Sequence, residues 1–188
     1  IAMKRLLFLT ILVLGFSCNS KDQWVDDLNN AVKEYNKNAE LEEKEYLVDS
    51  GTSTAIFVAP YKEQNGIRKT VFRHMRTEVM YFERHIFFKG DDIVYEHHMG
   101  IAPRLVSAEG RGVKASNYLI FNKQSFFKNN EVGKQFRQQQ VVDEFVNKDS
   151  VLSIVQSLDI EESFLYHEDY LEIKNYLNDI QALERIEE

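Results

Sequence analysis

The chain has 188 residues, 44% of them apolar and 28% charged, with a formal net charge of −7. This length and composition fit one globular domain and exclude a disordered, collagen-like or coiled-coil chain. The single cysteine excludes a disulfide framework or a multi-thiolate metal cluster made by this chain alone, and the acidic balance argues against nucleic acid as a partner.

The N-terminal residues have the pattern of a targeting segment. Lys4 and Arg5 precede a run of nine residues, LLFLTILVL, which contains no charged residue. A positive start followed by a short apolar run and small residues is typical of a secretory signal peptide. The run is too short to span a bilayer, which takes about 20 residues. We therefore expect residues 1–17 to be a signal peptide.

The end of this segment, Gly15-Phe16-Ser17-Cys18, resembles a bacterial lipobox, although its Leu14 lies one residue further from the cysteine than the usual pattern has it. The resemblance implies that Cys18 is acylated and becomes the mature N-terminus. It predicts a single lipid-anchored domain, residues 18–188, whose partner at that end is the membrane of a bacterial cell envelope. Asn19 in place of Asp favours the outer membrane.

The first elements after the anchor are a helix and a hairpin. Apolar residues recur at helical spacing over 22–38, which predicts an amphipathic helix. Residues 53–129 are rich in β-branched and aromatic residues, which predicts strands. Asn65-Gly66, between Thr54–Tyr61 and Ile67–Met75, predicts a type I′ hairpin turn. Pro60 predicts that the first of these strands is an edge, or that its ladder ends there.

Further turns divide the rest of the strand region. Lys89-Gly90-Asp91-Asp92 predicts a second hairpin with arms Val79–Phe88 and Ile93–Met99. Gly110-Arg111-Gly112 predicts a loop, and a turn is expected near Asn122-Lys123. Residues 131–147 fit either helix or strand.

Two helices are expected near the C-terminus, around 151–158 and 166–180. The fold class is therefore α+β. We expect an antiparallel meander of about five to six strands, with the N-terminal and C-terminal helices packed on one of its faces.

The second predicted hairpin contains the side chains best suited to metal binding or catalysis. If Phe88 faces Ile93 and the pairing continues unbroken, His85 faces Glu96 and Glu83 faces His98. These four side chains would then share one face, with opposite Cβ atoms about 4.5–5.5 Å apart. Imidazole and carboxylate groups at that spacing suit a divalent metal ion or a general base. Alternatively, they are ordinary cross-strand pairs on a wet face.

Positive charge gathers in the middle of the sequence. Residues 104–139 carry two acids and seven bases, whereas residues 143–188 carry thirteen acids and three bases. This pattern indicates either local charge balance between neighbouring elements or a basic face for an anionic partner. In the second case Arg104, Arg111 and Lys114, around the expected loop, are the candidate partner-binding residues.

Three functions fit these features. The first is a lipid-anchored envelope module that binds a partner protein, a glycan or another envelope component, without catalysis. The second is a metal-dependent envelope hydrolase that uses Glu83, His85, Glu96 and His98. The third is an inhibitor or immunity-type lipoprotein with a protruding loop at 100–113. The sequence contains no Gly-rich phosphate loop and no nucleophile-elbow motif, so no cofactor is expected.

The anchor prediction is tested by intact-mass analysis of protein extracted from membranes. We expect the wild-type chain to begin at Cys18 and to carry the mass of acyl chains, because two or three such chains anchor a protein stably. The Cys18→Ser variant should lack that mass. An unmodified wild-type chain that begins near residue 18 would instead indicate a freely secreted protein, and retention of residues 3–17 would contradict the signal peptide.

Overall fold

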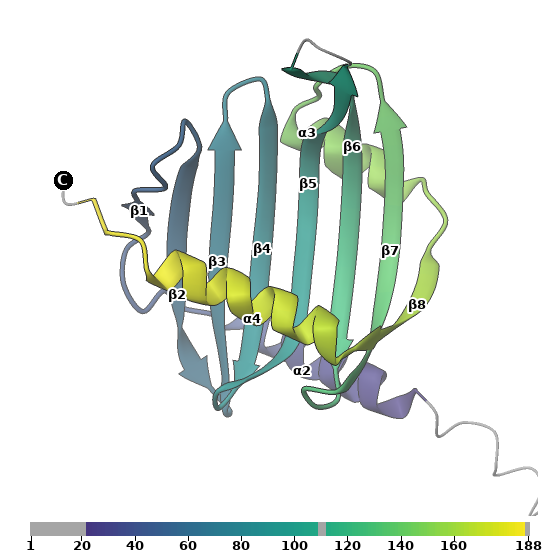
Figure 1. Cartoon of the computed structure of the whole chain (residues 1–188). Coiled ribbons are helices and arrows are strands. Elements are labelled where there is room, and N and C mark those ends of the chain that lie inside the picture. The colour runs from purple at the N-terminus through teal and green to yellow at the C-terminus, as the bar shows by residue number, and fades with distance from the viewer. Residues whose placement is uncertain (1–21, 109–111, 187–188) are drawn as a thin grey trace, which may run out of the picture.

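The computed structural model describes residues 22–108 and 112–186, with only the backbone described for 105–108 and 112–116. Within these residues, eight strands form one antiparallel sheet whose spatial order follows the chain (Figure 1). The strands are β1 (Tyr46–Val48), β2 (Ala55–Gln64), β3 (Ile67–Arg76), β4 (Met80–Lys89), β5 (Asp92–Ala108), β6 (Gly112–Phe127), β7 (Val132–Val142) and β8 (Glu161–Tyr166). The helices are α2 (Gln23–Lys37), α3 (Lys148–Gln156) and α4 (His167–Gln181). The predicted α+β meander is confirmed, with eight strands rather than five to six.

The β2–β3 hairpin forms at Asn65-Gly66, as predicted. Both residues have positive φ angles, 53° and 74°, which is the backbone that a type I′ turn requires. β2 is not an edge strand, because β1 pairs with its residues Ile56 to Val58. The β1 ladder ends at Val58, and therefore does not reach Pro60, which pairs with Thr70 on the β3 side.

Two predictions within the later strands are corrected. No turn forms at Asn122-Lys123, because β6 runs through these residues and pairs with β5 and β7 on its two sides. The ambiguous segment 131–147 contains strand β7. β8 was not predicted, and its sequence, EESFLY, buries only Leu165. A strand with one buried side chain has no apolar alternation by which to recognise it.

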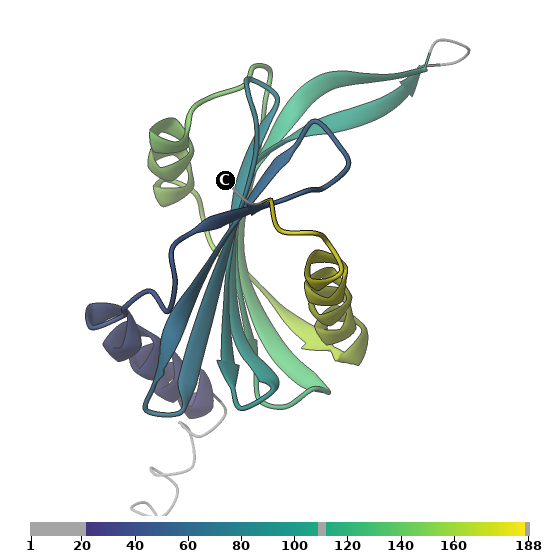
Figure 2. The ribbon, with the colours of Figure 1, turned by 90° about the vertical axis from the view of Figure 1, so that its left-hand side faces the viewer.

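Helices cover both faces of the sheet, not one as expected. Figure 2 shows α4 on one face, and α2 and α3 on the other. We call these the α4 face and the α2/α3 face. Phe88 and Phe127 pack with α4, whereas Phe87 and Phe126 pack with α2. Neighbouring aromatic residues on one strand are therefore buried on opposite sides. None of the described helices combines the length and apolar character that crossing a bilayer takes.

The residues after α4 return to the first strand of the sheet. The Asp49 N–H donates to the Glu184 carbonyl (2.8 Å), and the Ile186 N–H donates to the Leu47 carbonyl (3.0 Å). We call residues 182–186 the C-terminal strap. α4 crosses the sheet from β8 toward β1 (Figure 1), and the strap fastens its far end to the outer side of β1.

Gly100 marks a close approach between the central strands. It lies opposite Phe82 in β4, and a Cβ atom added there would lie 2.2 Å from the Tyr81 carbonyl oxygen and 2.4 Å from the Phe82 Cβ. Gly90, in the β4–β5 turn, has a φ of +60° but nothing within 4 Å of such an atom. Gly100 thus allows β4 and β5 to approach closely, whereas Gly90 allows the left-handed backbone of the turn.

We expect Gly100→Ala to lower the free energy of unfolding by about 3 kcal/mol, because backbone atoms of β4 would have to move. Gly90→Ala should cost only about 1 kcal/mol, from the left-handed backbone alone. Urea denaturation monitored by circular dichroism measures both. Equal losses in the two variants would show that β4 and β5 are not held as closely as described.

Candidate functional site

The β4–β5 hairpin begins in the predicted register but does not keep it. Phe88 faces Ile93, and the next pair is Phe87 with Tyr95, so Val94 is an extra residue on β5. Such a β-bulge moves every later residue of the strand by one position. As a result His85 faces His97, and Arg84 faces His98.

This shift separates the four predicted metal ligands. Glu83 and His85 lie on the α2/α3 face, whereas Glu96 and His98 lie on the α4 face, because a one-residue shift exchanges the faces of a strand. The predicted single cluster on one face is therefore wrong. In the described part of the chain, no group of three or more His, Cys, Asp or Glu side chains is arranged to hold a metal ion.

Glu83 is the centre of a polar network on the α2/α3 face. Its buried carboxylate accepts hydrogen bonds from the Tyr81 hydroxyl and from Lys148 Nζ (2.8 Å), and His85 Nε2 lies 3.2 Å away. Arg73 Nε adds an ion pair at 3.4 Å. Burial alone would raise the pKa of Glu83, but these partners hold it well below its usual range. The carboxylate thus stays ionised and connects β4 to β3 and to α3.

A second chain of polar groups connects the same face to α3. His97 Nε2 and Asn122 Oδ1 are 2.6 Å apart, and Asn122 donates to Gln138 (2.8 Å). Gln138 donates in turn to the carbonyls of Val155 and Leu158, at 2.7 and 2.9 Å. Both partly buried amides therefore find partners, and the chain fixes the end of α3 on the sheet.

A buried ion pair lies beneath α4. Arg84 Nε donates to Glu96 Oε1 at 2.6 Å, and both side chains are less than 9% exposed. The guanidinium carbon of Arg84 lies 4.0 Å from the centre of the Tyr176 ring of α4, which adds a cation–π contact. Burial raises the pKa of Glu96, and Arg84 opposes that change. Removing one partner would leave the other as an uncompensated buried charge.

Two histidines lie beside this pair. The ring of His74 stacks on Phe82 at 4.3 Å, and its Nε2 lies 2.6 Å from the Tyr176 hydroxyl. His98 Nε2 is buried and makes no hydrogen bond within the described part of the chain. Burial, with the Arg84 charge nearby, lowers the pKa of His74 to about 4 and that of His98 to about 2. Both rings are therefore neutral at pH 7.

A polar cavity of about 150 Å³ adjoins the ion pair. Its walls carry Arg84 and Lys123 from the sheet, together with acidic Glu96, Asp169 and Glu172. Charges of both signs line this space, so it offers no clear preference for an anion or a cation. We call it the polar cavity.

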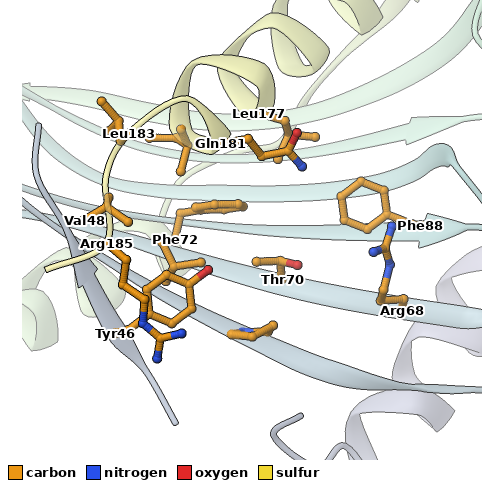
Figure 3. Close-up of a pocket in the computed structure, with 13 residues that line it drawn as sticks. Tyr46, Val48, Arg68, Thr70, Phe72, Phe88, Leu177, Gln181, Leu183 and Arg185 are labelled. Atoms are coloured by element: carbon orange, nitrogen blue, oxygen red, sulfur yellow. The ribbon is translucent and has the colours of Figure 1, made fainter. Parts of the chain in front are cut away.

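A different pocket, of about 340 Å³, lies between the sheet and the end of α4 (Figure 3). We call it the α4 pocket. Its apolar walls come from Val48, Val58, Phe72 and Phe88 on the strands, and from Leu177, Ile180 and Leu183 on α4 and the strap. Ligand pockets typically occupy about 300–1,000 Å³ and have mostly apolar walls. This pocket is at the small end of that range.

Two arginines give the α4 pocket a positive character. Figure 3 shows Arg68 and Arg185 at opposite ends, with Phe72 and Thr70 between them. Arg185 lies over the Tyr46 ring at 4.0 Å and pairs with Glu43 at 3.3 Å. Arg68 lies over the Phe88 ring at 4.8 Å, and no carboxylate of the described chain lies within 4 Å of its guanidinium. Arg68 is therefore free to bind an anion.

Two of the three predicted basic residues, Arg104 and Lys114, lie on β5 and β6. β4 pairs with β5 only as far as Ile101, and β7 pairs with β6 only as far as Tyr118. Beyond these residues, β5 and β6 continue as a two-stranded ribbon that projects from the sheet (Figure 2). Arg104 is exposed on this ribbon. Lys114 lies on it by its backbone, opposite Val106.

Three predicted features are not described by the structure. Arg111 and Cys18 lie outside the described residues, as does the signal peptide, 1–17. Comparisons with protein-family models, with curated proteins and with solved structures find no match.

The sequence did not point to the α4 pocket. Alternation along β3 places Arg68, Thr70 and Phe72 on one face, and this much could have been expected. The unpaired state of Arg68 and its distance from α4 depend on tertiary packing. The strap that carries Arg185 gives no apolar periodicity by which to recognise it.

The buried His74 makes stability dependent on pH. Its pKa is about 4 in the folded chain and about 6.5 in an unfolded one. Between these values the unfolded state binds a proton that the folded state does not, so stability falls as the pH falls. Between pH 7.5 and pH 5, we expect the free energy of unfolding of His74→Gln to fall by about 2 kcal/mol less than that of the wild type.

Urea denaturation at the two pH values measures this difference. Glutamine keeps a polar group near Tyr176 but cannot titrate. Asn175→Gln, which changes an exposed side chain of α4 without a titratable group, is the matched control and should lose as much stability as the wild type. Equal pH dependence in His74→Gln and the wild type would contradict the buried, neutral state of His74.

Proposed function

We propose that the protein is a lipid-anchored binding module of a bacterial cell envelope, and that the α4 pocket binds a small organic anion with an apolar body. The observation that carries this proposal is a pocket of about 340 Å³ that combines apolar side chains with an arginine, Arg68, that has no acidic partner among the described residues. The anchor rests on the lipobox-like residues that end at Cys18.

The pocket suits such a ligand in two ways. Apolar area buried against Phe72 and Leu177 supplies affinity, at roughly 25 cal/mol per Å². The arginine guanidinium presents several donors in one plane, which match a carboxylate, phosphate or sulfonate. Since the chain as a whole is acidic, this local positive charge selects anions at the pocket rather than over the whole surface.

Ligand binding is tested with anilinonaphthalene sulfonate as a fluorescent probe and octanoate as a competitor. We expect the wild type to enhance the probe's fluorescence and octanoate to reverse it. Arg68→Ala should weaken binding about tenfold, because loss of one charge-assisted hydrogen bond costs about 1.5 kcal/mol or more.

Two further variants show whether the α4 pocket is the site. Arg76→Ala removes an exposed arginine from the same face of β3 but outside the pocket, so it should bind as the wild type does. Thr70→Tyr places a ring in the middle of the pocket and should abolish binding without lowering the melting temperature. Undiminished binding in both Arg68→Ala and Thr70→Tyr would contradict the proposal.

The projecting ribbon supports a second candidate, an inhibitor or immunity-type lipoprotein. Beyond Ile101 and Tyr118, β5 and β6 pair only with each other, so both outer backbone edges are open. Arg104 is exposed on this ribbon. A ribbon of this kind offers backbone edges and a cation to the cleft of another protein. If the wild type binds neither probe, the ribbon becomes the stronger candidate.

The metal-dependent hydrolase loses its geometric basis, because its four residues are divided between the two faces.

A further inference from the structure

An exposed apolar patch lies at one corner of the domain, where β7 begins and β8 ends. Val132 and Tyr166 pair across these strands and are 49% and 63% exposed. Phe164, two residues before Tyr166 and on the same face of β8, is 65% exposed. Large apolar side chains that gather on a surface mark a contact with something else. We call these three residues the β8 corner.

The start of α2 is tied to the β8 corner. Lys134 Nζ bridges Asp22 Oδ1 at 2.6 Å and Glu162 Oε1 at 2.7 Å. The same ammonium group lies 5.6 Å from the centre of the Phe164 ring. Asp22, the first residue that the structure describes, is therefore held beside the exposed aromatic side chains.

The chain before Asp22 is short. Only residues 19–21 separate it from Cys18, and a fully extended chain spans at most about 3.6 Å per residue. Cys18 therefore lies within about 15 Å of Asp22. An acylated Cys18 would place the start of α2, and the β8 corner that Lys134 joins to it, near the lipid.

We propose that the β8 corner rests on the bilayer, with Phe164 and Tyr166 at the level of the lipid headgroups. This inference rests on the proposed acylation of Cys18. Tyrosine is enriched at membrane interfaces, where its ring is buried and its hydroxyl stays wet. Phe164 adds a second exposed ring beside it.

The charges around the corner indicate which lipid it meets. Lys134 is neutralised by Asp22 and Glu162, and Glu161 and Glu168 lie nearby in sequence. An acidic border is repelled by anionic lipids. The corner therefore fits a surface of zwitterionic headgroups, and its contact with lipid is aromatic rather than electrostatic.

This contact would orient the whole domain. β8 and β1 are opposite edges of the sheet, and the α4 pocket draws its strand residues from β1 to β4. With the β8 corner on the bilayer, the α4 pocket lies on the side of the domain away from the lipid.

The test uses the full chain, extracted from membranes and reconstituted in phosphatidylcholine vesicles with brominated acyl chains, which quench nearby tryptophan. Phe164→Trp is made in a Trp24→Phe background, which removes the only native tryptophan. Leu41→Trp in the same background is the matched control, because Leu41 is 45% exposed and bridges to β2 near the opposite edge of the sheet.

We expect Phe164→Trp to lose most of its emission in brominated vesicles, relative to unbrominated ones, and Leu41→Trp to lose little. Intact mass of the same samples separates the two proposals. If Cys18 is acylated and Phe164→Trp is unquenched, docking of the corner is overturned and the anchor stands. If Cys18 is unmodified and the chain stays off the vesicles, the anchor and the docking are both overturned. A blue-shifted but unquenched Phe164→Trp, in a protein that cross-links as a dimer, would instead assign the corner to a second copy.

Discussion

The bulge at Val94 sets the register of the two central strands, and much of the structure depends on it. It places Glu96 on the α4 face, 2.6 Å from Arg84. Without the extra residue, Glu96 would lie on the α2/α3 face, and Arg84 would lose the buried carboxylate that it now bonds beneath α4. Breaking a buried ion pair in this way costs several kcal/mol. The buried ion pair thus depends on the bulge.

With this register, polar groups attach the helices differently on the two faces of the sheet. On the α2/α3 face, Glu83 bonds Lys148, and the chain from His97 to Gln138 ends on carbonyls at the end of α3, so both attach α3 to the sheet. On the α4 face, the buried ion pair of the central strands lies beneath α4, and the end of α4 covers the α4 pocket instead. Polar contacts thus hold α4 over the centre of the sheet and leave open volume near β1, as expected of a pocket covered by a fixed helix.

Local patterns predicted much of the fold. The Asn65-Gly66 turn, α2 and both C-terminal helices follow from turn chemistry and from apolar spacing. The bulge was missed, because the apolar run Ile93-Val94-Tyr95 fits a regular strand buried on both faces as well as it fits an extra residue. β8 could not be found, because it buries a single side chain. The helices on both faces were also missed, yet the pairs Phe87-Phe88 and Phe126-Phe127 put one ring on each side.

The C-terminal strap has a consequence for how the protein reaches its native state. Its hydrogen bonds join Leu47 and Asp49 to Glu184 and Ile186, so they connect segments that are far apart in the sequence. Contacts between residues so distant in sequence form slowly, because a long loop must close first. During synthesis they cannot form until the strap itself has been made, after every strand of the sheet. The wall of the α4 pocket that carries Arg185 is therefore among the last parts of the domain to be completed, and loss of the strap would disturb this pocket before the sheet.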